Sequence, residues 1–342
     1  MLDDMLRLCS IPGVSGCEHA VREYIVSAVG GCGACSTDAL GNLIVFKKGK
    51  KSRQKKLMLA AHMDEVGLIV VYITDEGFLK FTTVGGIVTG ILPGKRVLVG
   101  DGKVPGVIGI KPVHLADKKE ASEVPGADSL YIDIGASSRE QAEKAVGVGD
   151  CAVFDSDPVE FGDGLLKARA LDDRCGCAVL LDLIRSEIPY DTWFAFTVQE
   201  EIGLRGASAA AFRIEPDFAV VVETTTAADL PGVEGEKRVC ALGGGAVVSF
   251  MDKTTLYDRK LYDMAFRLGK AEAIKMQTKT LVAGGNDAGS IHRSRGGVKT
   301  LTVSVPCRYL HSPACVVSLS DVREVRKLVY ALIGGMTDDQ AH

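Results

Sequence analysis

Hydrophobic positions follow a helical period at the start of the chain and a strand-like pattern soon afterwards. Within residues 1–10 and 21–28, apolar side chains recur three and four positions apart, which predicts two amphipathic helices. Short apolar runs over 42–46 and 57–61 have the length typical of strands. The first 65 residues are therefore predicted to combine helices with strands of a buried sheet.

After residue 161, helix and strand patterns alternate to the end of the chain. This alternation predicts a mixed sheet with helices on both faces, an α/β fold. The predicted strands cover 193–198, 218–223, 247–250 and 301–305. The predicted helices cover 175–186, 202–212, 260–275 and 319–336.

The stretch 66–161 has a different pattern of hydrophobic and polar residues. Its short β-branched segments are separated by Gly, Pro and Asp turns and show no helical period, which predicts a compact all-β unit. We therefore expect two domains: a discontinuous catalytic domain of residues 1–65 and 162–342, and an inserted β-barrel-like domain of residues 66–161.

Composition narrows the class of protein. The 342 residues carry a net charge of −4, so the chain lacks the basic field expected for nucleic-acid binding. No apolar stretch approaches the roughly 18 residues needed for a membrane span, and no basic-then-apolar leader opens the sequence. We expect a cytoplasmic protein with no nucleic-acid or membrane partner. In that compartment its 10 cysteines are expected to be reduced thiols.

Residues that bind metals gather where the predicted strands end. Ligands of open α/β sheets bind beyond the carboxyl ends of the strands, so these positions are expected to share one rim. Imidazoles and carboxylates together suit a divalent ion such as zinc, or alternatively cobalt. The candidates are His62 and Asp64 after 57–61, Glu200 and Glu201 after 193–198, Glu223 closing 218–223, His311 after 301–305, and Asp172 with Asp173 before a helix.

The charge count favours two ions rather than one. Asp172, Glu201 and Glu223 carry about three negative charges, and a bridging hydroxide adds a fourth, which balances two divalent ions. Neighbouring residues of an extended strand point to opposite sides, so one of Glu200 and Glu201 is expected to be a ligand and the other a base. Asp64 is placed to orient the His62 imidazole.

Several motifs resemble those of the dinuclear metallo-aminopeptidases of the glutamyl and deblocking family. AAHMDEVG, ALDDRCG, VQEEIGLRGA, ETTTAADLPG, GGND and VPCRYLHS occur in order along most of the chain. The resemblance implies an aminopeptidase that removes N-terminal residues from peptides with a free amino group. It also implies homo-oligomers, either dimers or hollow tetrahedral dodecamers, with the 66–161 insertion helping to build the dimer.

The resemblance also implies a role for each residue. His62 would bind the first metal ion, Glu223 would complete that site, and Asp172 would bridge both ions. Glu201 and His311 would bind the second ion, and Glu200 would be the general base. A cis peptide would join Asp172 to Asp173. The chain departs from the family pattern at Glu223, where relatives usually carry Asp, and at Asn286, where they usually carry Thr.

Two other classes of function are consistent with parts of the sequence. Some relatives bear an endoglucanase name, but a glycosidase needs two carboxyl groups flanking the bond and no metal, which leaves both histidines unexplained. A non-catalytic metal-binding assembly protein would keep the fold without activity. Sensitivity to a chelator and activity on aminoacyl substrates separate these alternatives.

Overall fold

The computed structural model describes residues 1–115 and 123–336. Its helices are α1 (Leu2–Ser10), α2 (His19–Val29), α3 (Arg139–Glu143), α4 (Leu171–Arg185), α5 (Arg205–Ile214), α6 (Arg259–Ala271), α7 (Ala288–Ile291) and α8 (Leu319–Gly335). Its strands are β1 (Ala34–Thr37), β2 (Leu43–Lys47), β3 (Leu57–His62), β4 (Gly67–Ile73), β5 (Leu79–Val84), β6 (Arg96–Val99), β7 (Val104–Gly109), β8 (Tyr131–Asp133), β9 (Cys151–Phe154), β10 (Val159–Phe161), β11 (Leu165–Ala168), β12 (Thr192–Thr197), β13 (Phe218–Thr226), β14 (Ala246–Val248), β15 (Met276–Thr278), β16 (Lys299–Arg308) and β17 (Cys315–Ser318).

A mixed sheet of 11 strands forms the larger part of the molecule. Its main path runs β1-β2-β12-β3-β13-β16-β17-β11-β10, and β14 joins it through β16. The central strands β12, β3, β13 and β16 are parallel to their neighbours in this row. Every residue of β3 is buried, as expected for a strand covered on both faces. The predicted α/β fold with a mixed sheet is confirmed.

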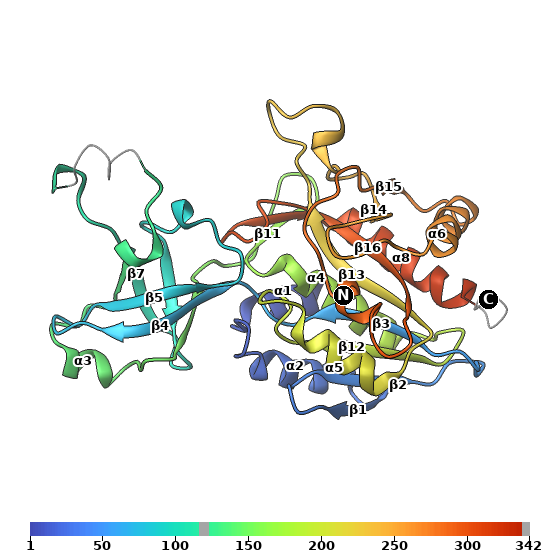
Figure 1. The fold of residues 1–342 in the computed structure, drawn as a ribbon, viewed down its shortest axis with the longest axis horizontal. Helices are drawn as coiled ribbons and strands as arrows, with labels where there is room; N and C mark the ends of the chain where they lie inside the picture. Colours follow the sequence, from blue (N-terminus) through green and yellow to red (C-terminus); the bar gives the residue numbers. More distant parts are fainter. Residues whose placement is uncertain (116–122, 337–342) are drawn as a thin grey trace.

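Alternate residues of the central strands face two separate cores. On one face, Leu57 and Leu59 of β3 pack with residues of α1, α2, α4, α6 and α8. On the other face, Met58 and Ala60 pack with α5 and α7. The period-two alternation of the strand therefore places helices on both faces, as predicted (Figure 1).

The second body is a closed barrel with the strand order β4-β5-β8-β7-β6-β9. It has a core of its own, built from residues such as Leu68, Phe81 and Ile132. Figure 1 shows it at the left, beside the large sheet. Strand β10, near the end of the stretch 66–161, pairs with β11 of the large sheet.

Most predicted elements of the catalytic part are present, with one clear error. The helix predicted over 260–275 ends at Ala271, since Ala273 has a left-handed φ of 52° and the chain then enters β15. Among the described residues, no helix has the length and apolar character needed to cross a bilayer.

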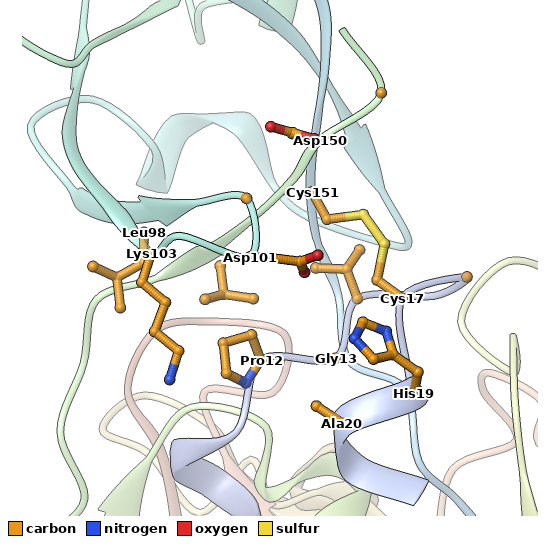
Figure 2. Close-up of a pocket in the computed structure, with 15 residues that line it drawn as sticks. Pro12, Gly13, Cys17, His19, Ala20, Leu98, Asp101, Lys103, Asp150 and Cys151 are labelled. Atoms are coloured by element: carbon orange, nitrogen blue, oxygen red, sulfur yellow. A yellow bond between two sulfur atoms is a disulfide. The ribbon is translucent and has the colours of Figure 1, made fainter. Parts of the chain in front are cut away.

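The prediction that all cysteines are free thiols is wrong for one pair. Cys17, in the turn before α2, forms a disulfide with Cys151 at the start of β9 (Figure 2). The bond joins the large domain to the barrel, and its two cysteines are 134 residues apart in the sequence. The sequence pattern could not indicate the pairing, because it depends on how the two segments meet in space. It lies beside a cavity of about 470 Å³, here called the junction cavity, whose lining includes Pro12, Asp101 and Lys103.

Candidate metal centre

The predicted site residues converge at one rim of the large sheet. His62 ends β3, Glu200 and Glu201 follow β12, and Glu223 lies within β13. Because β12, β3 and β13 are parallel neighbours, their carboxyl ends lie at the same edge. The two remaining predicted ligands join them there, Asp172 from the first turn of α4 and His311 from the turn after β16.

The carboxylate of Asp172 lies between the two imidazoles. Its Oδ1 is 3.4 Å from Nε2 of His62, and its Oδ2 is 3.3 Å from Nε2 of His311. Glu223 Oε2 lies 3.7 Å from the same His62 nitrogen, and Glu201 Oε2 lies 3.3 Å from the His311 nitrogen. The donors thus form two groups, and each group faces one oxygen of Asp172.

Asp173 is a neighbour whose role the sequence analysis did not assign. Its carboxylate, His62 and Glu223 offer ligand atoms within 4.8 Å of one another, as do His62, Asp172 and Glu201. A cis peptide joins Asp172 to Asp173, as the family resemblance implied. Asp173 Oδ1 accepts a hydrogen bond from the backbone N–H of Gly176, so this carboxylate also holds the start of α4. The adjacent pair of acids was the only signal for it in the sequence.

The carboxylates fit a pair of divalent cations. Buried polar atoms are normally paired, because an unpaired one loses its hydration without compensation. Five buried carboxylate oxygens make no hydrogen bond among the described residues, and all but Asp287 Oδ1 belong to this group of candidate ligands: Asp172 Oδ1, Asp173 Oδ2, Glu201 Oε1 and Glu223 Oε1. Such a concentration of uncompensated oxygen ligands beside two imidazoles is the donor set expected for zinc or a similar ion.

Asp64 holds His62, Glu200 and Glu201 in position through hydrogen bonds. It is fully buried, and its carboxylate accepts hydrogen bonds from the backbone N–H groups of Glu200 and Glu201 at 3.0 and 3.1 Å. Nδ1 of His62 lies 3.4 Å from Asp64 Oδ1 and 3.1 Å from the Asp64 backbone oxygen. The Ser15 hydroxyl donates a further bond at 2.6 Å. Asp64 therefore directs Nε2 of His62 toward the other ligands.

The barrel supplies the corresponding partner for the second imidazole. Nδ1 of His311 lies 3.0 Å from the backbone oxygen of Gly86, in the segment that follows β5. At the preceding position, Gly85 has a φ of 82°, and a Cβ added there would come within 3.3 Å of the Glu201 side chain. The insertion thus contacts His311 directly and runs close to Glu201, and no local pattern in the sequence indicated this.

The pKa values of several residues in this cluster are shifted toward the protonated form. Burial raises the pKa of Glu201 to about 7, and the nearby Asp172 adds to this effect. Burial likewise raises the pKa of Glu200 well above its usual value. For His311, burial lowers the pKa, but Asp172 and Glu201 outweigh it and raise the value to about 10. Divalent cations would remove the need for these protons.

The site opens into a cavity of about 610 Å³, here called the metal-centre cavity. Asp172, Glu200, Glu201, Glu223 and His311 line one part of it. The rest is lined by the end of β13, by the segments that follow β13 and β15, and by individual residues near β5, β12, β14 and β16. A substrate can therefore reach the ligands without rearrangement of the core.

Residues 41–328 match the family described as M42 glutamyl aminopeptidase. The chain belongs to this family. The M42 match spans the five predicted metal ligands, and it confirms the sequence-based prediction of a metallo-aminopeptidase.

Relatives of known name agree with the M42 assignment. The chain is 34% identical to a lysyl aminopeptidase of Pyrococcus furiosus over 96% of its own length and 95% of that protein. It superimposes on the TET aminopeptidase of a marine sediment archaeon, Thaumarchaeota archaeon SCGC AB-539-E09, with a TM-score of 0.95, 33% identity, and coverage of 99% and 98% of the two chains. A similar match is the TET1 peptidase of Pyrococcus horikoshii, with a TM-score of 0.85, 35% identity, and coverage of 97% and 98%.

The endoglucanase alternative rests on a name alone. A Thermotoga maritima structure called an endoglucanase matches this M42 chain with a TM-score of 0.81, 37% identity and 96% coverage of each chain. The convergent histidines and orphaned carboxylates have no use in metal-free glycoside hydrolysis. Because the chain belongs to a peptidase family, a catalytic function is favoured over that of a non-catalytic assembly protein.

Proposed function

We propose that this M42 aminopeptidase removes N-terminal residues from peptides with a free amino group by means of a dinuclear metal centre. The observation that carries the proposal is the position of Asp172, with each carboxylate oxygen 3.3–3.4 Å from a different histidine. Asp172 would bridge the ions, His62 and Glu223 would complete the first site, and Glu201 and His311 the second. Asp173, which lies beside the first group, would support it.

Two divalent cations bound there would polarise the scissile carbonyl and acidify the attacking water. Glu200 would take the proton from that water and later deliver it to the leaving amine. Its buried position beside other carboxylates raises its pKa, which suits a group that must both accept and donate a proton. Asp64 would act as a positioning residue by fixing His62 and the backbone of Glu200 and Glu201.

Zinc is the ion we favour and cobalt the second choice, since two imidazoles with carboxylates suit borderline-soft divalent ions. We further propose that the chain acts in the cytoplasm, and that residues 66–161 form a dimerisation domain beside a catalytic domain of residues 1–65 and 162–342. Residues 116–122 and 337–342 of these ranges lie outside the described part of the structure. The tetrahedron or octahedral shell of the Pyrococcus horikoshii relative supports assembly into a homo-oligomer, as a dimer or a tetrahedral dodecamer.

The Glu200→Gln variant tests the mechanism. It removes the base but keeps a side chain of the same size, so we expect both metal ions to be retained and kcat on aminoacyl p-nitroanilides to fall about 10²- to 10⁴-fold. Metal content measured by mass spectrometry on the same sample separates lost chemistry from lost metal. The exposed Glu272→Gln serves as the control. A Glu200→Gln enzyme within a few-fold of the wild-type rate would refute the base assignment.

A further inference from the structure

The metal-centre cavity contains a cation that the proposed chemistry does not use. Lys279 directly follows β15, and its backbone N–H donates to the oxygen of Val248 at 3.1 Å, which fixes it at the edge of the sheet. Its side chain lines the same cavity as Glu223 and His311. Among the residues that line this cavity, Lys279 alone is a lysine or arginine.

The ammonium group of Lys279 is only partly satisfied by the protein. Its hydrogen bond within the described residues goes to the backbone oxygen of Ala283 at 3.0 Å, and none of the ion pairs formed there includes it. The nearby carboxylate of Asp252 is already engaged by the hydroxyl of Tyr257 and the N–H groups of Thr254 and Thr255. Lys279 therefore keeps donors available for a ligand.

Partial burial makes such a cation more selective. The side chain is half-buried, and burial lowers the pKa of Lys279 while Asp252 and Glu223 oppose that shift. A charge in a partly dehydrated pocket gains more from an opposite charge than it would in water. An anion brought beside Lys279 would therefore stabilise it, whereas a second cation would be repelled.

The lining of the cavity combines the charged metal centre with a remainder in which Lys279 is the charged residue. The acidic side chains in the lining (Asp172, Glu200, Glu201 and Glu223) all belong to the metal centre. Apart from the acids, His311 and Lys279, the lining is uncharged and combines apolar residues such as Leu281 and Leu310 with polar ones such as Asn286. In the proposed binding mode the scissile bond lies at the metal centre, and the first side chain of the peptide projects into this remaining space.

We propose that Lys279 is a specificity-determining residue that selects peptides beginning with glutamate or aspartate. This inference rests on the proposed function, because it assumes that the cavity receives the N-terminal side chain. The names of related proteins do not decide which N-terminal residue is preferred. The matched family is described as glutamyl aminopeptidase, but one relative is named a lysyl aminopeptidase. The ammonium would pair with the side-chain carboxylate of the substrate.

The decisive measurement compares kcat/KM for the p-nitroanilides of Glu, Gln, Leu and Lys. Gln matches Glu in size, so their ratio isolates the charge, and a p-nitroanilide carries no peptide carboxylate that Lys279 could bind instead. We expect the wild type to prefer Glu over Gln. Lys279→Met should lower the Glu/Gln ratio by about 10- to 100-fold and leave the Leu rate within about threefold.

Two further variants exclude a merely structural role. Lys279→Arg keeps the charge and should retain most of the Glu preference, whereas Lys279→Glu should shift preference toward Lys. The exposed Lys253→Met is the matched control. As a readout apart from turnover, calorimetry of the metal-loaded protein should show tighter binding of L-glutamate than of L-glutamine, with the difference lost in Lys279→Met.

The outcomes are distinguishable from those that test the mechanism. A wild type that prefers Leu or Lys, or a Glu/Gln ratio unchanged in Lys279→Met, overturns the role of Lys279 but leaves the aminopeptidase intact. A metal-loaded wild type that cleaves none of the four substrates, under conditions where it binds two ions, contradicts the proposed function itself.

Discussion

The metal-centre cavity and the junction cavity have comparable volumes, about 610 and 470 Å³, yet only one of them is equipped for catalysis. The first collects the ends of parallel strands and holds buried carboxylate oxygens without hydrogen bonds. The second lies between a turn of the large domain and the barrel, and the charged side chains of Asp101 and Lys103 at its edge are exposed.

The difference shows that buried, uncompensated charge is a better indicator of function than the size of a cavity. Exposed charges are hydrated and cost little, so they demand no partner. Buried carboxylates persist only where a ligand, a proton or a cation stabilises them. In this molecule a covalent link between two bodies lies beside the junction cavity, whereas the metal-centre cavity holds the residues proposed to carry the chemistry.

The same substitution made in each cavity gives the largest expected contrast. Asp172→Asn removes the charge that both histidines face, so we expect loss of bound metal and a fall in kcat/KM of roughly 10³-fold or more. Asp101→Asn in the junction cavity should stay within about twofold of wild type. Metal analysis and p-nitroanilide kinetics measure both. Equal effects of the two variants on metal content and kcat/KM would show that the two cavities do not differ in function.

The disulfide provides the second contrast, in stability rather than activity. Replacing both Cys17 and Cys151 with Ser should lower the free energy of unfolding by about 2–4 kcal/mol, because the cross-link restricts the unfolded chain. Turnover should change less than about threefold, since Asp64 keeps its bonds to the Glu200 and Glu201 backbone. Urea denaturation with and without reductant measures the first effect.

A thiol count checks that the bond is present. Denatured but unreduced protein should show eight reactive thiols, since two of the 10 cysteines are paired, and 10 after reduction. Ten thiols before reduction would show that the pair does not form in the isolated protein.

The smallest expected effect concerns the ligand that departs from the family pattern. Glu223→Asp withdraws the carboxylate by about one methylene from the first metal group, where Glu223 Oε2 now lies 3.7 Å from His62 Nε2. We expect two bound ions, a rate within about 10-fold of wild type, and a changed ratio of zinc to cobalt affinity. Competition titrations with a chromophoric chelator report the affinities. Loss of the first ion would show that the longer side chain is required.

The proposed ligands could be predicted because each lies in or just after a recognisable strand, or opens a helix. A buried apolar run such as 57–61 indicates where a strand ends, and parallel pairing brings the ends of neighbouring strands together. The contributions of Gly86, Lys279 and Cys17–Cys151 could not be predicted in this way. They depend on how the barrel docks and on where irregular segments lie, and neither is encoded in a local period of hydrophobicity.

The contact between Gly86 and His311 has a consequence for attempts to shorten this enzyme. The insertion leaves the chain after His62 and returns before Asp172, so it looks like a module that a short linker could replace. Excising it would remove the acceptor that sets the tautomer of His311. A trimmed enzyme would therefore need a substitute carbonyl engineered into the linker, and the barrel is better regarded as part of the catalytic apparatus than as an appendage.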